Sequence, residues 1–332
     1  MKEKALVLGA GGFIGNHLCN YLINKDFEVV GADLKYPEFD NTNCIKFHKG
    51  DLRDKEFTEK VILDPNFQFK YIFQLAADMG GAGFIFTGEN DADIMTNSLS
   101  INLNVLNSVV KLKKIHQNPT IFYSSSACIY PEELQLEAED VSLKEKFAYP
   151  ANPDSDYGWE KLISERLFMA YQKDYGIDIR IARFHNIYGP YGTWDGGREK
   201  APAAMCRKVA EVKNGETIEV WGDGNQTRSF LFIEDCLEAV YRLMKSSYKK
   251  PINIGSEEMV SINRLVEIVS EVADKNIEIN HIDGPLGVRG RNSNNDLVRK
   301  ELNWDYQYSL KKGIEVTYKW INQQVLQMEK NE

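Results

Sequence analysis

Hydrophobic and polar positions alternate in blocks along the first half of the chain. Short runs rich in β-branched and aromatic residues, each closed by a turn signal, are typical of strands. These runs lie at residues 4–9, 28–33, 44–48, 71–75, 120–124 and 178–183. Between the first two, Ile14, Leu18 and Leu22 recur at helical spacing. The alternation predicts an α/β fold, a Rossmann-type doubly wound parallel sheet with crossover helices on both faces.

The composition of the sequence changes after residue 185. Glycine and proline then punctuate short segments, as in residues 188–192, which predicts a smaller α/β lobe. Apolar residues at 230–244 and 251–255 indicate a return to the first domain. We therefore expect two discontinuous domains. A cofactor-binding domain comprises residues 1–185 plus about 230–255, and a substrate-binding lobe comprises about 186–229 plus 256–332.

Composition and charge narrow the class of protein. The 332 residues carry 40 basic and 49 acidic side chains, a net charge of −9, which argues against nucleic acid as a general partner. No apolar run approaches the roughly 20 residues of a membrane span, and the N-terminus leads straight into a strand without a signal-peptide pattern. Five scattered cysteines without a C-x-x-C pair predict neither a disulfide framework nor a metal site. A reducing cytoplasm fits this usage best.

A glycine-rich turn follows the first strand and opens a helix. Gly9, Gly12 and Gly15 would let the backbone approach a pyrophosphate that faces the helix N-terminus. Ile14 spoils the strict G-x-G-x-x-G spacing, so the motif depends on its position between strand and helix. Asp33, at the end of the second strand, would accept hydrogen bonds from a ribose and disfavour a 2′-phosphate. The pattern predicts NAD as the cofactor.

Further cofactor contacts are expected at the ends of neighbouring strands. Asp51 and Leu52 follow the third strand and are placed to cap an adenine. Ala76 follows the fourth strand and offers space beside the cofactor, while Phe13 and Ile14 belong to the glycine turn itself. Alternatively, the residues after the third and fourth strands simply end those strands and do not contact the cofactor.

Chemically active side chains gather in two places on the sequence. Tyr157 and Lys161 are four residues apart, so a helix would present both on one face. An ammonium beside a phenol favours the phenolate, which can then take a proton from a sugar hydroxyl near neutral pH. Upstream, the fifth strand runs into Ser126 and Cys128. A cysteine at a strand end is usually a small buried hydrophobe, but its place beside Ser126 indicates a step other than hydride transfer.

Together, Ser126, Tyr157 and Lys161 resemble the extended short-chain dehydrogenase/reductase family, especially its nucleotide-sugar epimerases and dehydratases. The resemblance implies that the tyrosine abstracts the hydroxyl proton. It implies that the lysine holds the nicotinamide ribose and lowers the tyrosine pKa, and that the serine hydrogen-bonds the reacting oxygen. Segments similar to a GDP-sugar branch of the family lie at residues 75–85, 125–132, 183–190, 196–204, 221–230 and 287–293. Ala82 and residues 86–93 depart from that branch.

The same branch implies a second pair of catalytic residues, Cys128 and Lys200. Oxidising a sugar at C4 makes the C3 and C5 hydrogens acidic, because the resulting carbanions are enolates. Inverting these carbons needs an acid and a base that reach both faces. A thiol, with an unperturbed pKa of about 8.5, and a lysine whose pKa is lowered by burial suit this task. Outside this context, Lys200 would be interpreted as a solvated loop lysine.

An acidic protein needs local cations to hold the two phosphates of a nucleotide sugar. Arg228 and Arg291 are the expected partners, with Lys208 as a third, although a surface ion pair remains an alternative for each. Residues 79–83 are expected to form a flexible loop that closes over the sugar. The remaining substrate contacts implied by the resemblance are Gly83, Ser126, Ala127, Cys128, Asn186, Glu199, Lys200, Ala201, Gln226 and Thr227.

The expected protein is therefore an NAD-dependent isomerase acting on GDP-mannose or a related GDP-sugar. The resemblance also implies a homodimer formed by helices at residues 98–114 and 158–175. A 4-epimerase is one alternative, although it would leave Cys128 and Lys200 idle. A 4,6-dehydratase would use an acidic pair where Ala127 and Cys128 stand. A non-catalytic NAD sensor or scaffold, and the same chemistry on another GDP-sugar such as a GDP-heptose, also remain open.

Overall fold

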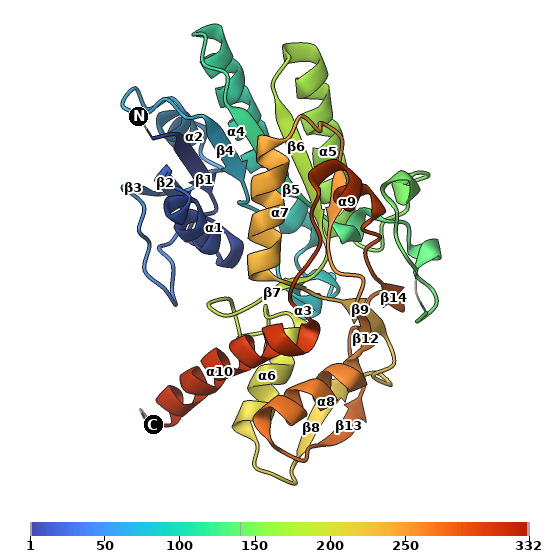
Figure 1. Ribbon diagram of the computed structural model, residues 1–332. Helices are drawn as coiled ribbons and strands as arrows, with labels where there is room; N and C mark the ends of the chain where they lie inside the picture. Colours follow the sequence, from blue (N-terminus) through green and yellow to red (C-terminus); the bar gives the residue numbers. More distant parts are fainter. Residues whose placement is uncertain (1, 140, 331–332) are drawn as a thin grey trace.

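A seven-stranded sheet forms the centre of the molecule in a computed structural model that describes residues 2–139 and 141–330 (Figure 1). The strand order is β11-β6-β5-β4-β1-β2-β3, and every neighbouring pair is parallel. The strands are β1 (Lys4–Leu8), β2 (Glu28–Asp33), β3 (Lys46–Lys49), β4 (Tyr71–Gln74), β5 (Thr120–Ser126), β6 (Ile179–Phe184) and β11 (Ile252–Ile254).

Helices cover both faces of this sheet, because successive strand side chains point to opposite sides. Ala5 and Val7 pack in one apolar cluster with α1 and α7, whereas Leu6 and Leu8 pack in another with α2, α4 and α5. The helices are α1 (Phe13–Asn24), α2 (Lys55–Ile62), α4 (Asp91–Lys114), α5 (Asp156–Tyr175) and α7 (Ile233–Lys245). The two faces make this a doubly wound α/β fold.

The rest of the chain forms a smaller assembly below the sheet in Figure 1. Its helices are α6 (Ala201–Glu211), α8 (Ile262–Ala273) and α10 (Leu310–Glu329), which contact one another. Three small sheets accompany these helices. In the first, β7 (Ile187–Tyr188) pairs with β10 (Leu231–Phe232), and in the second, β8 (Thr217–Trp221) pairs with β13 (Glu278–Ile282). In the third, β9 (Thr227–Ser229) lies between β12 (Met259–Ser261) and β14 (Gly290–Arg291). Short helical pieces are α3 (Ala82–Ile85), η1 (Ala127–Ile129), η2 (Glu132–Leu134), η3 (Glu145–Ala148) and α9 (Asp296–Leu302).

The structure confirms the predicted fold class and all six predicted strands, with boundaries shifted by a few residues. It also confirms the return of the chain to the sheet, since β11 pairs with β6. The domain limits stay a prediction. One apolar cluster runs from the sheet into the lobe, and α9 contacts β11 and α7 although the prediction assigns its residues to the lobe.

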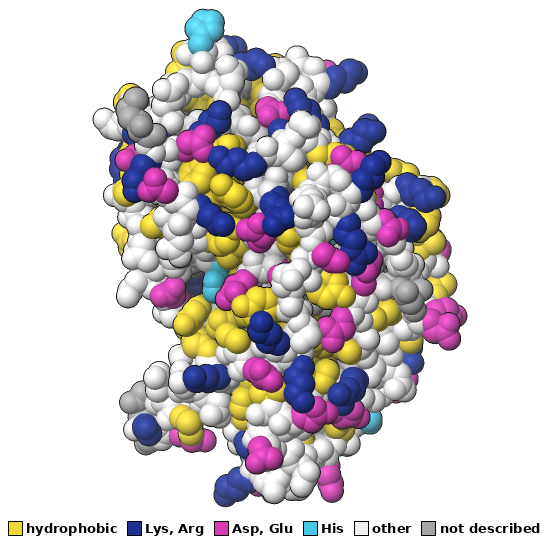
Figure 2. Space-filling view, in the orientation of Figure 1, with side chains coloured by type: hydrophobic (Ala, Val, Ile, Leu, Met, Phe, Trp, Pro, Cys, Tyr) yellow, Lys and Arg dark blue, Asp and Glu magenta, His cyan; other side chains and the backbone are white. Residues whose placement is uncertain are grey.

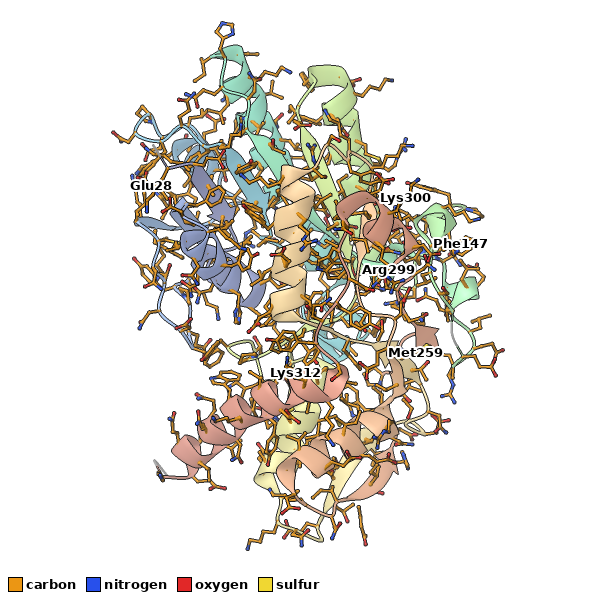
Figure 3. The ribbon with its side chains drawn as sticks, in the orientation of Figure 1. Glu28, Phe147, Met259, Arg299, Lys300 and Lys312 are labelled. Carbon is orange, nitrogen blue, oxygen red and sulfur yellow. The ribbon has the colours of Figure 1, made fainter. Side chains whose placement is uncertain are left out.

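Figure 3 marks the two parts, with Glu28 at the start of β2 and Met259 and Lys312 in the lobe. On the face shown in Figure 2, basic and acidic side chains are interspersed, and no continuous basic surface is seen there. No helix within the described residues is long and apolar enough to cross a membrane.

Candidate active site

The cofactor crevice lies at the carboxyl ends of β1 and β4. The helix after β1 covers one face of the sheet and the long helix after β4 covers the other, so a crevice opens between the two strands. Gly9 has a φ of +89°, and a Cβ there would lie 2.8 Å from the Ala76 nitrogen. A Cβ on Gly15 would lie 1.9 Å from the Gly9 carbonyl oxygen. Both positions therefore require glycine.

The N-terminus of α1 opens into this crevice. Gly12 caps the helix without a side-chain hydrogen bond, and the first turn, which begins with Phe13 and Ile14, contains no acidic residue. A Cβ on Gly12 would meet only the Gly9 oxygen, at 3.4 Å, so the space in front of the helix is open. Unpaired N–H groups at such an end suit a phosphate.

Asp33 lies beside the glycine turn. Its Oδ2 accepts a hydrogen bond from the Gly11 nitrogen at 2.9 Å, and its Oδ1 accepts one from the Lys35 nitrogen at 3.2 Å. Burial raises the pKa of this carboxyl, and the backbone donors lower it in part. The carboxylate is thus fixed at the end of β2, where a ribose would lie. The glycine turn, the helix end and Asp33 together fit NAD.

The other predicted adenine contacts already have partners. Asp51 makes hydrogen bonds to the Arg53 guanidinium, 2.7 Å at the shortest, and that charge lowers its pKa. Leu52 is buried, and its carbonyl accepts hydrogen bonds from Thr58 and Asn104. Their role toward the cofactor stays a prediction.

Ser126, Tyr157 and Lys161 meet where β5 ends and α5 begins. Ser155 caps α5, and Tyr157 and Lys161 lie one turn apart in its first residues. The Lys161 ammonium donates to the Ser124 carbonyl at 3.2 Å and lies 5.7 Å from the centre of the Tyr157 ring. The Ser126 hydroxyl is within hydrogen-bonding reach of the Tyr157 phenol. The structure therefore brings all three predicted residues together.

The expectation of a phenolate near neutral pH is wrong for the chain by itself. Burial raises the pKa of Tyr157 well above its usual value, and the charges of Cys128 and Glu160 raise it further. Burial also lowers the pKa of Lys161, although Glu160, 4.0 Å away, opposes this. The desolvated ammonium, 5.7 Å from the centre of the ring, therefore does not dominate the ionisation of the phenol.

Lys200 reaches the same site from the lobe. It caps α6, which starts at Ala201. The Gly81 nitrogen donates to the Arg198 carbonyl at 3.0 Å, and a Cβ on Gly81 would lie 2.1 Å from the Glu199 oxygen. This close backbone approach fixes the segment before Lys200. Burial lowers the pKa of the Lys200 ammonium and the nearby Cys128 side chain opposes this shift, so the two groups are close enough to interact electrostatically.

The segment at residues 79–83 is only partly the loop that the sequence predicts. Ala82 and Gly83 lie in the short helix α3, which the Gly81 nitrogen anchors to residue 198. The Arg198 guanidinium lies 3.8 Å over the Phe84 ring. These contacts give the segment a regular structure and hold it against residues 198–199.

Cys128 lies in η1, just past β5, and Ala127 before it is buried. Its sulfur lies 3.0 Å from Nη1 of Arg291. Nη2 of Arg291 lies 3.0 Å from Oδ2 of Asp154, and its Nε donates to Oε1 of Gln135 at 2.5 Å. Each guanidinium nitrogen thus has a partner in the protein, and the partner of Nη1 is the predicted catalytic thiol.

The other predicted phosphate partners are also bonded within the protein. Arg228 donates to the carbonyls of Val288, at 2.6 Å, and Leu286, at 3.1 Å. Burial, together with the nearby Arg291 charge, lowers the pKa of Arg228 to about 10. Lys208 donates to the Glu219 carbonyl at 2.6 Å. Their role toward a diphosphate stays a prediction.

Four further predicted substrate residues make hydrogen bonds to backbone groups. Asn186 donates to the Ser229 carbonyl, Thr227 to the Ala138 carbonyl and Gln226 to the Trp221 carbonyl, while Glu199 accepts from the Gly197 nitrogen. Oε1 of Gln226 is buried and has no hydrogen-bond partner among the described residues. It is therefore an acceptor that a substrate donor would satisfy.

Sequence reasoning missed Asp154 and Gln135. Their partner Arg291 follows them by 137 and 156 residues, so no local pattern marks either one. His185, expected to be structural, is fully buried against Asn253, and burial lowers its pKa to about 3. Within the described residues, no group of three or more His, Cys, Asp or Glu side chains is arranged to hold a metal ion.

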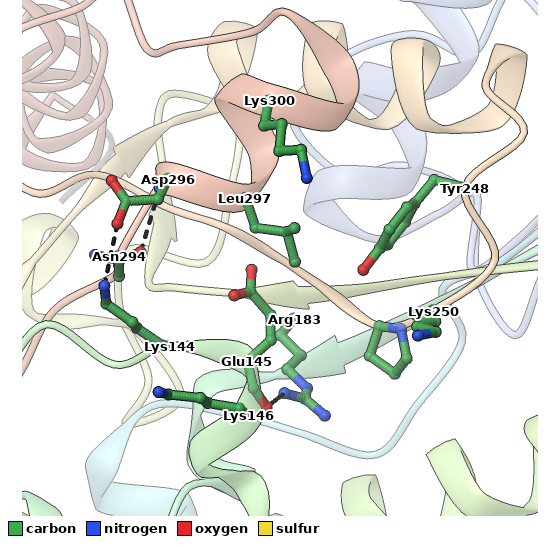
Figure 4. A pocket seen from close by; sticks show the side chains of 11 residues that line it. Lys144, Glu145, Lys146, Arg183, Tyr248, Lys250, Asn294, Asp296, Leu297 and Lys300 are labelled. Carbon is green, nitrogen blue, oxygen red and sulfur yellow. Dashed lines mark hydrogen bonds and ion pairs between the residues drawn. The ribbon is translucent and has the colours of Figure 1, made fainter.

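A separate cavity of about 550 Å³ opens between η3, α9 and the end of β6 (Figure 4). Three of its charged side chains are in ion pairs, since Lys144 bonds Asp296 and Arg183 bonds Glu165. No predicted site residue lines it. The lining residues are Lys144, Glu145, Lys146, Arg183, Tyr248, Lys250, Pro251, Asn294, Asp296, Leu297 and Lys300.

Comparison with known proteins places these features in context. A family model described as the NAD dependent epimerase/dehydratase family matches residues 5–255. A GDP-mannose 3,5-epimerase of Arabidopsis thaliana is 48% identical over 324 residues, covering 97% of this chain and 83% of the relative. A putative UDP-glucose 4-epimerase of Methanocaldococcus jannaschii is 29% identical, covering 95% and 97%. The structure of a Bacillus cereus UDP-glucuronic acid 4-epimerase with UDP-glucuronic acid and NAD superimposes with a TM-score of 0.79 at 25% identity, covering 97% and 99%.

Proposed function

The chain belongs to the NAD-dependent epimerase/dehydratase family, and from that premise we propose that it is a GDP-mannose 3,5-epimerase. It converts GDP-D-mannose to GDP-L-galactose, and inversion at C5 alone yields GDP-L-gulose. The observation that carries this proposal is the placement of Cys128 and Lys200 at the site of Ser126, Tyr157 and Lys161. The 48% identity to the Arabidopsis enzyme over nearly the whole chain supports it.

The cofactor half of the site performs the redox step. NAD, when bound, supplies the acceptor and later the donor of the C4 hydride. Tyr157 takes the proton of the C4 hydroxyl, and Ser126 holds the same oxygen by a hydrogen bond. Because burial alone keeps Tyr157 protonated, we propose that Lys161, anchored by the Ser124 carbonyl, acts together with the positive charge that bound NAD would supply to stabilise the phenolate that accepts this proton. The product of this step is a 4-ketone with acidic hydrogens at C3 and C5.

The lobe half of the site performs the inversions. Cys128 belongs to η1 on the sheet side and Lys200 precedes α6 in the lobe, and we propose that the sugar binds between them with one face toward each. One group removes the proton from C5 or C3 and the other delivers a proton to the opposite face. Buried Gln226 Oε1 is available to a sugar or base donor. Return of the hydride to C4 leaves no net oxidation.

A 4-epimerase is the second candidate, favoured by the 29% identity to the putative UDP-glucose 4-epimerase. That reaction needs only Ser126, Tyr157 and Lys161 and a sugar free to rotate. Cys128 and Lys200 would then have no chemical role. The unfavourable burial of the Lys200 ammonium, which lowers its pKa, would have no functional reason. We therefore favour the 3,5-epimerase.

Incubation with GDP-mannose in D₂O tests the proposal. Deuterium should enter C5 and C3, detected by NMR of the sugar, without consumption of added NAD. UDP-glucose serves as the parallel substrate. Inversion at C4 of UDP-glucose, with no exchange in GDP-mannose, would contradict the proposed function and favour the second candidate.

The proposed assembly is a homodimer in which α4 and α5 of each subunit form a four-helix bundle. The two helices contact each other, and they expose the apolar side chains of Leu103, Trp159 and Ile163. Burial of this surface would favour association, and sedimentation of the purified protein measures it. We also propose a cytoplasmic location, supported by five cysteines that are all free.

A further inference from the structure

A buried carboxylate lies next to the side chain of Lys161. Glu160 directly precedes this lysine on α5, and the Glu160 and Lys161 side chains are 0% and 4% exposed. Oε2 of Glu160 lies 4.0 Å from Nζ of Lys161, and this oxygen has no hydrogen-bond partner among the described residues. Burial of a carboxylate oxygen without a partner is unfavourable. The steps assigned above to the active site give this carboxylate no task.

The other oxygen of Glu160 belongs to a buried hydrogen-bond network. The Ser164 hydroxyl donates to Oε1 at 2.7 Å and accepts a hydrogen bond from the Asn102 amide at 2.9 Å. Asn102, on α4, in turn accepts a hydrogen bond from Gln74, at the end of β4, at 2.8 Å. All four side chains are buried. The network thus fixes Oε1 and leaves Oε2 available to Lys161.

Few groups favour the charged form of Lys161. Its Nζ donates to the Ser124 carbonyl at 3.2 Å and lies 5.2 Å from the centre of the Tyr123 ring. Burial lowers the pKa of Lys161, and two neighbours oppose this shift, Glu160 more strongly than Cys128. Among the carboxylates of the described residues, Glu160 is therefore the one that acts on this ammonium.

We infer that Glu160 is a positioning residue, whose carboxylate keeps the buried Lys161 side chain protonated and fixed beside the Tyr157 phenol. The inference rests on the proposed function to the extent that Lys161 stabilises the phenolate of the C4 step. An ammonium that leaves water loses its hydration, and an adjacent carboxylate restores part of that free energy. A neutral amine at this position could not stabilise an anion by its charge.

Glu160 also acts directly on the phenol, with the opposite sign. Burial is the largest cause of the raised pKa of Tyr157, and the Glu160 charge adds to it. Tyr123, packed against the same pair from β5, has its pKa raised by burial and then by Glu160. Removing the carboxylate should therefore lower the pKa of both Tyr157 and Lys161. The alkaline limb of the pH profile reports the loss of the ammonium, whereas the acidic limb reports the phenol.

The first experiment compares the pH profiles of wild type and Glu160→Gln. Glutamine keeps the size of the side chain and an acceptor for Ser164. The rate of NADH formation on mixing with GDP-mannose is measured as a function of pH, and the alkaline limb should move about one pH unit lower. Glu165→Gln is the matched control, because Glu165 is equally buried on α5 but pairs with Arg183 at 2.8 Å. It should lower stability without moving this limb.

Urea unfolding without sugar supplies a readout that does not depend on the substrate. At neutral pH, Glu160→Gln leaves the Lys161 ammonium uncompensated and should be less stable than wild type. Because the folded-state pKa of Lys161 lies below its ordinary 10.5, the native protein loses this proton first as pH rises toward that value. The cost of the ammonium then disappears in the variant, while wild type retains an unpaired carboxylate. The difference in stability should therefore shrink as pH rises.

Three outcomes overturn the inference. The first is an unchanged alkaline limb in Glu160→Gln, and the second is a shift of the acidic limb alone, which would mean that the carboxylate acts on the phenol. The third is a loss of stability that is the same at every pH, as a purely structural role requires. If wild type does not act on GDP-mannose, the proposed function fails, and the unfolding comparison still decides the role of Glu160.

Glu160→Asp keeps the charge and is the conservative variant. Its alkaline limb should lie close to that of wild type, and it decides the question if Glu160→Gln does not fold by circular dichroism. An alkaline limb lowered by about one pH unit in folded Glu160→Asp, despite the retained charge, overturns the inference.

Discussion

The two halves of the active site are built in different ways. Ser126, Tyr157 and Lys161 come from one strand end and the first two turns of one adjoining helix, both on the central sheet. Lys200 and Arg291, which face Cys128, come from separate segments of the lobe. The first half is thus set by elements that are rigid in themselves. The second depends on how the lobe is placed against the sheet.

The difference extends to the buried charges. Burial lowers the pKa of both Lys161 and Lys200. Lys161 has compensation, namely the Ser124 carbonyl at 3.2 Å and the Glu160 carboxylate at 4.0 Å. In the part of the chain that the structure describes, the Lys200 side chain has no hydrogen bond or ion pair. A buried ammonium without a hydrogen-bonded partner at an acid/base position is typical of a group kept for function at the expense of stability.

The largest expected effect separates the two halves by chemistry. Tyr157→Phe removes the group that accepts the C4 hydroxyl proton, so NADH formation and deuterium exchange should both fall about 10³-fold. Cys128→Ala should lower exchange at C5 and C3 by a similar factor while NADH still forms on mixing with GDP-mannose. Absorbance of bound NADH and NMR of the sugar measure the two steps. Full exchange in Cys128→Ala would remove the thiol from the mechanism.

A smaller effect is expected in the cofactor crevice. Asp33→Asn removes the carboxylate that Gly11 holds toward a ribose, so NAD affinity should fall about tenfold, or about 1.4 kcal/mol, and the preference over NADP should shrink. Calorimetric titration of both cofactors measures this. Asp26→Asn, in the exposed turn before β2, is the control. Equal NAD binding in wild type and Asp33→Asn would show that this carboxylate does not contact the cofactor.

The smallest expected effect concerns stability. Burial holds the pKa of Lys200 below its ordinary 10.5, so the cost of the buried ammonium is fully present below the folded-state value. As pH rises toward 10.5, the native state loses this proton before the unfolded state does, and the cost disappears. Lys200→Met should therefore abolish exchange yet raise unfolding free energy by about 1 kcal/mol near neutral pH.

Urea unfolding of Lys200→Met at neutral and at alkaline pH measures this, and the gain should shrink as pH rises. Lys319→Met, on the exposed side of α10, is the matched control and should change stability little at either pH. A loss of stability in Lys200→Met at neutral pH would mean that the ammonium is compensated after all.

Much of the sheet half could be predicted because its signals are local. Alternating apolar runs predicted β1, β2 and β4 to within a residue or two, since side chains that pack on two helix layers must be apolar at successive positions. Gly9 and Gly15 could be recognised because their neighbours in space are within the same turn or the next strand end. The spacing of Tyr157 and Lys161 placed both on one helical face.

The sequence did not predict properties that depend on contacts between distant segments or on the burial of a side chain. The ionisation of Tyr157 depends on desolvation by Phe84, Ile85 and Ile94, which pack around it from another segment. Arg291 could be marked as a cation near a phosphate, but its engagement by Asp154 and Gln135 could not. Asp154 and Gln135 lie in no periodic pattern. A side chain that binds a single distant partner does not require any repeating pattern in the residues around it.

By itself, the sequence determined the parallel sheet through its hydrophobic period, and it predicted NAD binding from glycines at positions where a Cβ cannot fit. Helical spacing paired Tyr157 with Lys161, whereas Ser126, Cys128 and Lys200 were predicted from the resemblance to a known family. The tertiary structure alone decided which charges stand beside Cys128, how deeply Lys200 is desolvated and that Arg291 is bound within the protein. Electrostatic energies depend on distance and on exclusion of water, and both are set only when the lobe packs against the sheet.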